Sequence, residues 1–294
     1  MKQISSFTIG SKLRDYMQLV KFNLSFMVVF SSVISYLLAP KIVGYDAKSL
    51  LLFFTAGFLV TGSANTINQI LEKQTDAMMK RTAKRPLASG RMSTTEAWTF
   101  AILAGGLGVL LLAYFFNMLS AGIAAFSLFL YAWVYTPMKK VSSISVLVGA
   151  VPGALPCLIG WAAGNDDVSA GGWALFAIQF FWQFPHFWAI AWIAFKDYAA
   201  AGFKMLPSDE GTTKYSAIQS IIYSLLLIPV GVIPYFLEMS GIVSLWIVLA
   251  ANLFMVIQCV RLYNEMTTNA ARRVMFSSYI HLPVVLLALL ADKV

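Results

Sequence analysis

The chain alternates between long apolar runs and short polar segments. About nine runs approach the ~20 residues that a helix needs to cross the hydrocarbon core of a bilayer. They cover residues 20–39, 49–71, 96–116, 119–136, 143–163, 173–194, 216–237, 241–260 and 273–291. Gly and Pro inside these runs are tolerated in membrane bundles, where neighbouring helices satisfy freed backbone groups. The pattern predicts an all-α integral membrane protein, a single polytopic domain over residues 1–294.

Composition supports this fold class. The chain is 59% hydrophobic and 12% charged, and its mean hydropathy is +0.75. A soluble domain would carry roughly a quarter charged residues. Cys157 and Cys259 lie inside apolar runs, which indicates core residues rather than a disulfide framework or a zinc site.

Positive charge is distributed unevenly between the loops. Eighteen of the 21 Lys and Arg residues fall in the N-terminal segment and in the loops that follow even-numbered runs. The positive-inside rule therefore places the N-terminus and these loops in the cytoplasm, and the C-terminus outside. Long loops in a compact bundle are usually functional or disordered. We expect cytoplasmic cap loops near residues 72–95, 137–142 and 195–215.

Three oxygen-bearing side chains recur at every fourth position where the second run ends: Asn68, Glu72 and Asp76. Residues at i, i+4 and i+8 of a helix share one face, and each step rises ~6 Å. Oxygen ligands of this kind suit Mg²⁺, which usually bridges a few protein oxygens to substrate phosphates. The sequence predicts Mg²⁺ as the cofactor with these three ligands. The alternative is a helix end that becomes charged on reaching water.

Further polar side chains are expected at the same cytoplasmic mouth. The cations are Lys21, Arg81, Arg85, Lys139 and Lys196, and the hydrogen-bonding groups are Tyr135, Asp197 and Tyr198. A metal together with cations is what a diphosphate needs.

Below this mouth we expect an apolar cavity lined with aromatic side chains. The candidates are Trp133, Trp182, Phe184, Phe187, Trp188 and Trp192. Such a cavity suits a hydrocarbon tail, and its π faces would stabilise a carbocation. A diphosphate joined to a long hydrocarbon is a prenyl diphosphate. The implied reaction is Mg²⁺-assisted loss of diphosphate, giving an allylic cation that alkylates a second substrate. The alternative is that these aromatic residues face lipid or pack helices.

One histidine lies in the aromatic stretch of the sixth run. An ionisable group inside a span is costly and is a functional candidate by default, and histidine is a common haem ligand. The alternative for His186 is a hydrogen bond to a carbonyl freed by Pro185. The residues alone leave both interpretations open.

These residues resemble the UbiA-type intramembrane prenyltransferases and, within that superfamily, the haem O branch of protohaem IX farnesyltransferases. The resemblance covers nearly the whole chain, from about Lys12 to the ninth run. Its motifs are Asn68-x-x-x-Glu72-x-x-x-Asp76 with the following Met79–Leu87, Tyr135-x-x-x-Lys139, and the segments Trp182–Trp188 and Phe195–Pro207.

The resemblance implies a fold and a reaction. The fold is nine helices around a central cavity, open sideways to the lipid and capped by cytoplasmic loops. The reaction is transfer of a farnesyl group from farnesyl diphosphate to a vinyl group of haem B, with water added. The product is haem O for terminal oxidases, which suggests a downstream haem-handling or oxidase assembly partner.

Roles are carried over residue by residue. Asn68, Glu72 and Asp76 would hold Mg²⁺ on the diphosphate, and Lys21 matches the basic position that opens the first helix. The other diphosphate contacts would be Arg81, Arg85, Tyr135, Lys139 and Lys196, and the acceptor contacts would be His186, Trp188, Asp197 and Tyr198.

Two departures from the superfamily pattern matter. Many relatives have Asp where this chain has Glu72. The superfamily's second metal motif is Asp-x-x-x-Asp, but here Asp197 is followed four residues later by Ala201. Lys196 or Lys204 would then supply charge in place of a second motif-bound metal.

Two competing functions remain. The first is prenylation of 4-hydroxybenzoate or a naphthoate for quinone synthesis, which an intact second acidic pair would have favoured. The second is a membrane transporter, which would place ionisable groups near mid-membrane on several helices. Here the charges gather almost entirely at one mouth.

Overall fold

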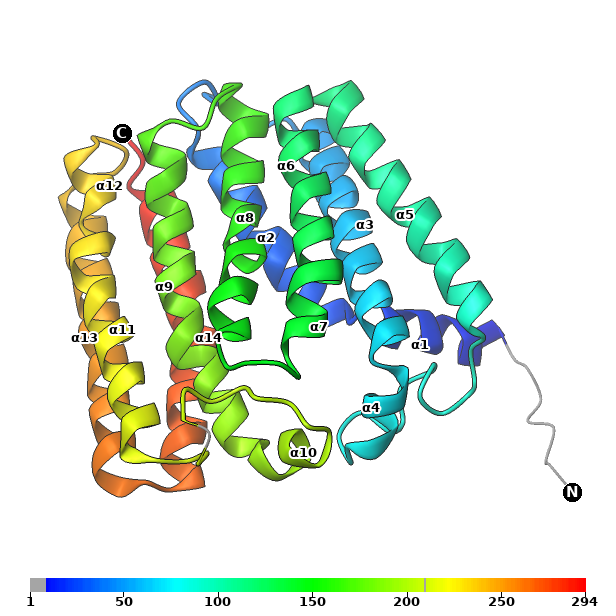
Figure 1. The fold of residues 1–294 in the computed structure, drawn as a ribbon. Coiled ribbons are helices and arrows are strands. Elements are labelled where there is room, and N and C mark those ends of the chain that lie inside the picture. The colour runs from blue at the N-terminus through cyan, green and yellow to red at the C-terminus, as the bar shows by residue number, and fades with distance from the viewer. Residues whose placement is uncertain (1–8, 209) are drawn as a thin grey trace, which may run out of the picture.

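The structure, a computed structural model, describes residues 9–208 and 210–294. These residues form helices and no strands (Figure 1). The elements are α1 Ile9–Leu19, α2 Phe22–Leu38, α3 Ala47–Leu71, α4 Lys73–Met78, α5 Thr94–Phe115, α6 Met118–Phe129, the π-helix η1 Leu130–Tyr135, α7 Thr136–Met138, α8 Ser145–Asn165, α9 Ala170–Ile193, α10 Phe195–Ala200, α11 Lys214–Gly231, α12 Ile233–Phe236, α13 Ile242–Glu265 and α14 Thr268–Ala291.

Polar side chains fix where several of the long helices begin. The side chain of the residue preceding the helix accepts a backbone N–H from its first turn at Asp46, Ser93, Asn117, Thr213 and Thr267. Short oxygen-bearing residues are favoured at this position because they satisfy donors that the helix leaves unpaired. The boundaries of α3, α5, α6, α11 and α14 therefore follow from local sequence.

The described helices confirm a multi-pass membrane protein but not the exact count of nine spans. Seven helical stretches are long and apolar enough to cross a membrane, or eight if α1 and α2, which meet at 52°, form one span. The 24-residue α9 is not among them. Its run contains Gln179, Gln183 and His186, which lower its hydropathy.

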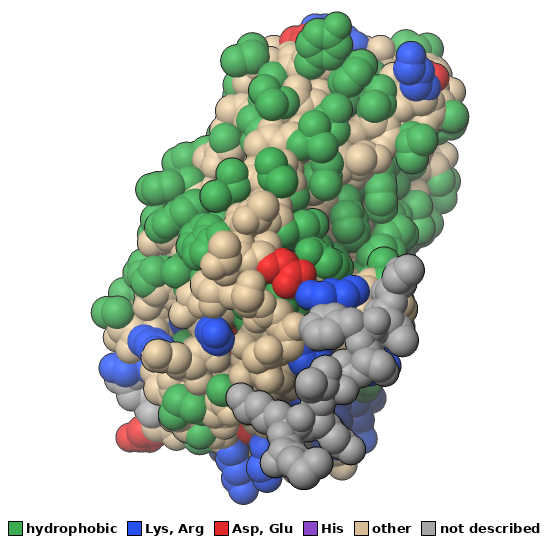
Figure 2. Space-filling model, turned by 90° about the vertical axis from the view of Figure 1, so that its right-hand side faces the viewer, with side chains coloured by type: hydrophobic (Ala, Val, Ile, Leu, Met, Phe, Trp, Pro, Cys, Tyr) green, Lys and Arg blue, Asp and Glu red, His purple; other side chains and the backbone are tan. Residues whose placement is uncertain are grey.

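One end of the bundle carries the three loops that the sequence predicts as caps. The short helices α4 and α10 lie at this end, and the C-terminus lies at the other (Figure 1). We call the first the cap end. In Figure 2 apolar side chains cover much of one lateral face, and Lys and Arg side chains gather towards the cap end. Lys2, one of the eighteen cations of the predicted cytoplasmic side, lies outside the described residues.

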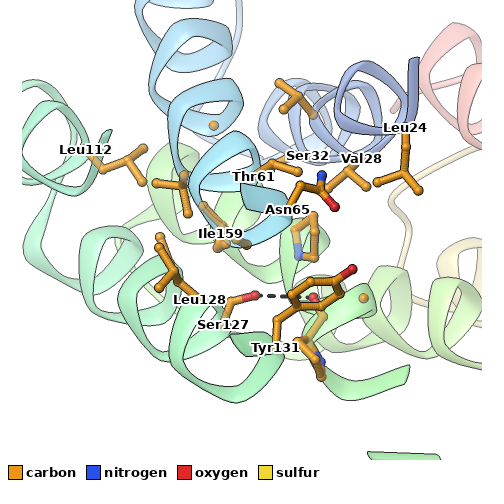
Figure 3. A pocket seen from close by; sticks show the side chains of 18 residues that line it. Leu24, Val28, Ser32, Thr61, Asn65, Leu112, Ser127, Leu128, Tyr131 and Ile159 are labelled. Atoms are coloured by element: carbon orange, nitrogen blue, oxygen red, sulfur yellow. Dashed lines mark hydrogen bonds between the residues drawn. The ribbon is translucent and has the colours of Figure 1, made fainter. Parts of the chain in front are cut away.

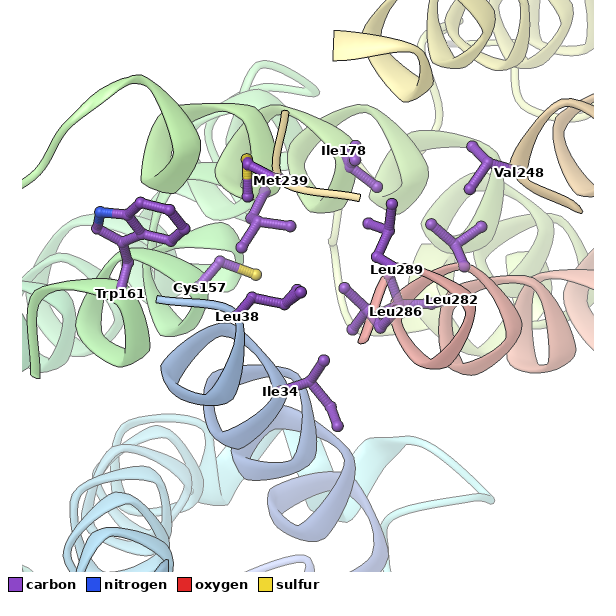
Figure 4. Packing of buried hydrophobic residues seen from close by; sticks show 12 residues of the cluster. Ile34, Leu38, Cys157, Trp161, Ile178, Met239, Val248, Leu282, Leu286 and Leu289 are labelled. Atoms are coloured by element: carbon purple, nitrogen blue, oxygen red, sulfur yellow. The ribbon is translucent and has the colours of Figure 1, made fainter. Parts of the chain in front are cut away.

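The main buried cluster lies in the half of the bundle away from the cap end. Ile34 and Leu38 of α2 pack there against α8, α9 and α14, through side chains such as Cys157, Ile178 and Leu286 (Figure 4). Cys157 and Cys259 are buried and form no disulfide. This cluster holds α2 against three other helices and leaves the cap-end half of α2 outside it.

Candidate functional site at the cap end

Each of the three predicted oxygen ligands is paired with a cation. Lys21 Nζ donates to Asn68 Oδ1 at 3.0 Å, and Lys139 Nζ lies 2.8 Å from Glu72 Oε1. Arg85 Nη1 reaches both carboxylate oxygens of Asp76, at 2.8 and 2.7 Å. The site is therefore a row of an amide and two carboxylates, faced by a row of three cations.

The helical spacing of the three ligands survives a break in the helix. α3 ends at Leu71 and α4 begins at Lys73, with Glu72 at the junction. The Glu72 N–H still donates to the Asn68 carbonyl at 2.9 Å, and the Asp76 N–H donates to the Glu72 carbonyl at 2.7 Å. Because both i to i+4 bonds form, the predicted sharing of one face holds across the junction.

A widened turn of helix delivers Lys139 to this row. η1 is a π-helix that ends at Tyr135, and π-turns inside helices are frequent at functional sites. The ammonium of Lys139 lies 4.6 Å from the centre of the Tyr135 ring. Burial is the largest single influence and lowers the pKa of Lys139, but the Glu72 carboxylate, together with Tyr131 and Tyr198, raises it, and the net shift is upward. Lys139 is therefore a protonated cation at neutral pH.

Lys21 reaches the row from a strained backbone position. It lies between α1 and α2 with φ 50°, in the left-handed region that side chains other than glycine rarely adopt. Its partner Asn68 also donates through Nδ2 to Thr136 Oγ1 at 3.2 Å. Thr136 Oγ1 in turn donates to the Tyr131 carbonyl at 2.8 Å. One amide thus connects the turn between α1 and α2 with α3 and α7, and Thr136 extends this chain of bonds to η1.

Hydrogen bonds join the three cap loops to one another. Arg81 Nη2 donates to the Tyr198 hydroxyl at 3.2 Å, and the Arg81 N–H donates to Asp197 Oδ2 at 3.4 Å. The Lys204 N–H donates to the Lys139 carbonyl at 2.8 Å. Lys196 is exposed, and no described residue forms a hydrogen bond or ion pair with it. The structure thus brings Arg81, Asp197 and Tyr198 to the cap but leaves Lys196 outside.

An apolar cavity lies next to the polar row. It encloses about 680 Å³ of empty space, part of which is open, between α2, α3, α5, α6, η1 and α8. Asn65 and Tyr131 line it (Figure 3), and Asn65 lies one turn before Asn68 on α3. The rest of the wall is mostly aliphatic, including Val28, Leu128 and Ile159. The cavity therefore suits a hydrocarbon chain whose polar end lies at Asn68.

The predicted aromatic lining is wrong for this cavity. Trp133 is exposed, and Phe184 and Trp188 pack around Tyr223 with ring centroids 4.1 and 5.2 Å from it. None of the predicted residues on α9 lines the cavity, because α9 packs these rings against α11, α13, α14 and the cap. The residues in question are Trp182, Phe184, Phe187, Trp188 and Trp192. Trp188 is therefore packed among other side chains and does not line this cavity.

His186 is hydrogen-bonded to a side chain and not to the carbonyl that Pro185 was expected to free. Its Nδ1 lies 2.7 Å from Ser278 Oγ of α14. The Trp182 ring stacks on the imidazole at 4.8 Å, with an interplanar angle of 15°. His186 thus belongs to the contact between α9 and α14.

Sequence reasoning missed Asn65, Thr136 and Tyr131. Asn65 donates to Ser25 Oγ at 3.0 Å and lines the cavity, whereas Thr136 and Tyr131 continue the chain of bonds from Asn68. The sequence did carry a signal for them, because polar side chains inside an apolar run are costly to place in a membrane and therefore mark functional candidates.

The donor set fits a divalent cation that shares its coordination with substrate oxygens. Within residues 9–208 and 210–294, no group of three or more His, Cys, Asp or Glu side chains could hold a metal by itself. The row instead offers two carboxylates and an amide, and Glu72 engages Lys139 through Oε1. Ionised carboxylates keep further lone pairs for other partners. Hard oxygen donors in small number, completed by phosphates, are the usual setting for Mg²⁺.

The helical bundle shares its fold with solved structures. The fold matches a structure described as digeranylgeranylglyceryl phosphate synthase, with a TM-score of 0.77 and 22% identity over 96% of this chain and 98% of that one. It also matches a UbiA homolog from Archaeoglobus fulgidus bound to GPP and Mg²⁺, with a TM-score of 0.66 and 16% identity over 94% and 99%. These likenesses establish the fold.

The family follows from sequence. Residues 28–280 match the model of the UbiA prenyltransferase family. The chain is 42% identical to the protoheme IX farnesyltransferase of Cytophaga hutchinsonii, over 97% of this chain and 100% of that protein. It is 39% identical to the protein of the same name from Flavobacterium psychrophilum, over 97% and 96%. The chain belongs to the UbiA prenyltransferase family.

Proposed function

We propose that this chain transfers the farnesyl group of farnesyl diphosphate to a vinyl group of haem B, with addition of water, and so makes haem O. The proposal rests on one observation, the paired rows of cations and oxygens placed beside the apolar cavity. The name of the relatives, protoheme IX farnesyltransferase, favours a haem acceptor over the quinone precursors. The product would pass to a downstream haem-handling protein.

We place the cap end in the cytoplasm, so that the N-terminus lies inside and the C-terminus outside. The support is the positive-inside rule together with the gathering of Lys and Arg at the cap end. A diphosphate would then enter from the cytosol, while its prenyl chain would lie within the membrane.

The residues of the row bind the leaving group. Asn68, Glu72 and Asp76 would hold Mg²⁺, which supplies Lewis-acid neutralisation of diphosphate charge when bound. Lys21, Arg85 and Lys139 already lie against these ligands and would contact the diphosphate oxygens. Tyr135 places its ring 4.6 Å from the Lys139 ammonium and would orient it, and Arg81, which donates to Tyr198 in the cap, would contact the diphosphate.

These cations favour ionisation of the substrate. As the allylic C–O bond breaks, its electron pair leaves with the diphosphate, and preorganised positive charge stabilises the charge that develops there. The wall of the cavity carries few nucleophiles, and the Tyr131 ring offers a π face to the allylic cation. The π pair of the haem vinyl group forms the new C–C bond. Water adds to the resulting cation and releases one proton.

The acceptor contacts of this proposal are His186, Asp197 and Tyr198. Arg81 donates hydrogen bonds to Asp197 and Tyr198. Tyr198, with Phe203 and Lys204, lines a second, partly open space of about 780 Å³. Trp188 is packed among other side chains and Lys196 is exposed, and neither forms a hydrogen bond with Arg81, Asp197 or Tyr198 in the described part of the chain.

The test is product analysis with the purified, detergent-solubilised chain. Haem B and farnesyl diphosphate with Mg²⁺ should give a haem whose mass has increased by a hydroxyethylfarnesyl group, and omission of farnesyl diphosphate should abolish it. EDTA should stop the reaction and added Mg²⁺ should restore it. In a parallel assay with 4-hydroxybenzoate as the acceptor, prenylation of that acceptor together with no mass gain of haem B would refute the proposal.

A further inference from the structure

The turn between α1 and α2 presents three backbone carbonyls that need donors from elsewhere. They belong to Gln18, Leu19 and Val20, at the C-terminal end of α1. The last carbonyls of a helix have no partner within it. The Lys21 N–H closes the turn on the Gln18 carbonyl, but at the long distance of 3.2 Å. The conformation of this turn therefore depends on donors from another element.

Two side-chain amides of α3 supply these donors. Gln69 Nε2 donates to the Leu19 carbonyl at 2.6 Å and to the Gln18 carbonyl at 3.2 Å. Asn65 Nδ2 donates to the Val20 carbonyl at 3.3 Å. Asn65 and Gln69 lie four residues apart on α3, so their side chains share one face of the helix. This face of α3 holds the turn.

The partners decide which end of each amide faces the turn. Carbonyl oxygens only accept, so Gln69 presents its NH2 group to both of its carbonyl partners. The Ser25 hydroxyl donates its hydrogen to the Val20 carbonyl at 2.6 Å, so its oxygen accepts from Asn65 Nδ2 at 3.0 Å. No described residue donates to the opposite, buried oxygens, Asn65 Oδ1 and Gln69 Oε1. The hydrogen bonds of both amides therefore serve this turn alone.

The held turn places Lys21 beside the first oxygen ligand of the row. Lys21 has φ 50° and ψ 59°, a left-handed conformation that is unfavourable for a residue with a Cβ. Its ammonium lies 3.0 Å from Asn68 Oδ1, and Asn68 lies between the two amides in the sequence of α3. A strained conformation persists only where its surroundings hold it. Without the amides, Lys21 would return to a negative φ and its ammonium would leave the row.

We propose that Gln69 is a positioning residue for Lys21, with Asn65 as its second support. This inference rests on the proposed function, in which Lys21 contacts the diphosphate. Gln69 is fully buried and lines neither the prenyl cavity nor the second space near Tyr198. It therefore acts on the substrate through the turn. The helix α3 then carries both an oxygen ligand and the groups that align the cation facing it.

The helix α1 has other anchors that do not involve Gln69. Lys12 Nζ lies 2.9 Å from Glu96 Oε1 of α5, and Arg91 Nη2 donates to Gln18 Oε1 at 3.0 Å. Loss of the Gln69 amide should thus leave α1 attached to the bundle and free the turn alone. A variant at Gln69 is for this reason a test of Lys21 placement and not of folding.

The test is a double-mutant cycle on substrate binding in the absence of haem. The probe is farnesyl thiodiphosphate with Mg²⁺, whose bridging sulfur slows cleavage, titrated calorimetrically into the purified full chain. Lys21→Met should raise Kd about 10-fold. Gln69→Met, which keeps the length of the side chain and removes its donors, should raise Kd at least ~3-fold. In the Lys21→Met background the same change should have less than a ~2-fold effect, because the two residues act as one unit.

Two further variants sharpen the test. Gln74→Met, at an exposed glutamine of α4, is the matched control and should leave Kd unchanged. Gln69→Asn, whose amide is one methylene shorter, is the milder variant and should show the same coupling to Lys21 at smaller size. An effect of Gln69→Met that is equal with and without Lys21 would overturn the positioning role, since general damage does not depend on Lys21. Wild-type affinity in Gln69→Met would overturn it as well.

The fate of haem separates this inference from the proposed function. Farnesyl transfer from farnesyl diphosphate to haem B is measured separately by product mass. Coupled Kd values without farnesylated haem refute the proposed function alone. Farnesylated haem together with additive effects of the Lys21 and Gln69 variants refutes the positioning role alone.

Discussion

Lys139 Nζ and Glu72 Oε1 lie 2.8 Å apart and join the turn after α7 to the junction of α3 and α4. Only 11% of the Lys139 side chain and 8% of the Glu72 side chain are exposed. The pKa of Lys139 is raised in the fold, so its charged form contributes stability at neutral pH that is lost as the pH rises through that pKa. The pair therefore holds two cap loops together while both groups stay ionised.

Glu72→Gln should invert this pH dependence. The variant leaves Lys139 buried without its carboxylate, so burial, the largest single influence on its pKa, is no longer offset by Glu72 and shifts that pKa downward. Breaking a buried pair in this way costs about 3–5 kcal/mol. We expect a lower Tm at pH 7 that recovers towards pH 10, where Lys139 becomes neutral. Glu72→Asp keeps the carboxylate and should retain the wild-type slope, and an unchanged slope in Glu72→Gln would contradict the argument.

Asp76→Asn should abolish farnesyl transfer while the protein still inserts into the membrane. Asp76 is fully buried, and its carboxylate is both a proposed metal ligand and the partner of Arg85. An amide is a weaker ligand for Mg²⁺ and leaves the guanidinium without its counter-charge. The measurement is turnover per purified enzyme.

The matched control for Asp76→Asn is Asp15→Asn. Asp15 also pairs with an arginine, with 2.9 Å between its Oδ1 and Arg91 Nη2, but it lies outside the row. The Asp15→Asn variant should keep near-normal turnover. Comparable activity of the two variants would remove Asp76 from the proposed metal site.

The polar row could be predicted from sequence because its rule is local. Asn68, Glu72 and Asp76 follow one another at helical spacing, and backbone bonds preserve that spacing across the junction at Glu72. The bond from Asn68 to Thr136 could not be predicted, since it depends on how α3 packs against η1 and the start of α7. The hydrogen bond between His186 and Ser278 could not be predicted either, because the two residues lie far apart in sequence.

The predicted cavity lining was wrong, and the exact count of nine spans was not confirmed, for a related reason. Aromatic residues on α9 were expected to line a cavity, but hydropathy alone does not say which face of a helix is turned inward. The chain buries the rings of Phe184 and Trp192 between helices. The polar residues that give α9 its contacts, such as Gln183 and His186, also lower its hydropathy.

Thr61→Phe should shorten the prenyl chain that the enzyme accepts. Thr61 lines the cavity seven residues before Asn68 on α3, about 10 Å away along the helix at ~1.5 Å per residue. A phenyl ring there would block the far part of the cavity. We expect KM to rise at least 10-fold for farnesyl diphosphate and less for geranyl diphosphate.

The control for this prediction is Thr55→Phe, the same change on the same helix at a position that is exposed. It should leave both KM values near wild type. An equal rise in KM for both prenyl diphosphates in Thr61→Phe would indicate general damage and would contradict the assignment of the cavity.

Lys293→Met should lower stability without changing the chemistry. Lys293 Nζ donates to the carbonyls of Leu37, Ala39 and Ile42 at 2.8, 2.9 and 2.8 Å, at the end of α2 away from the cap. The last carbonyls of a helix lack partners within it, and a hydrogen bond to a charged group contributes about 1.5–3 kcal/mol. Because Lys293 is partly solvated, we expect a net loss of roughly 2 kcal/mol, or about 5 °C in Tm.

The control is Lys48→Met, at an exposed lysine of the same end of the bundle, which should not shift Tm. Turnover at low temperature should be the same in both variants. Equal Tm values would show that the three carbonyl contacts do not stabilise the junction of α2 with the C-terminal segment.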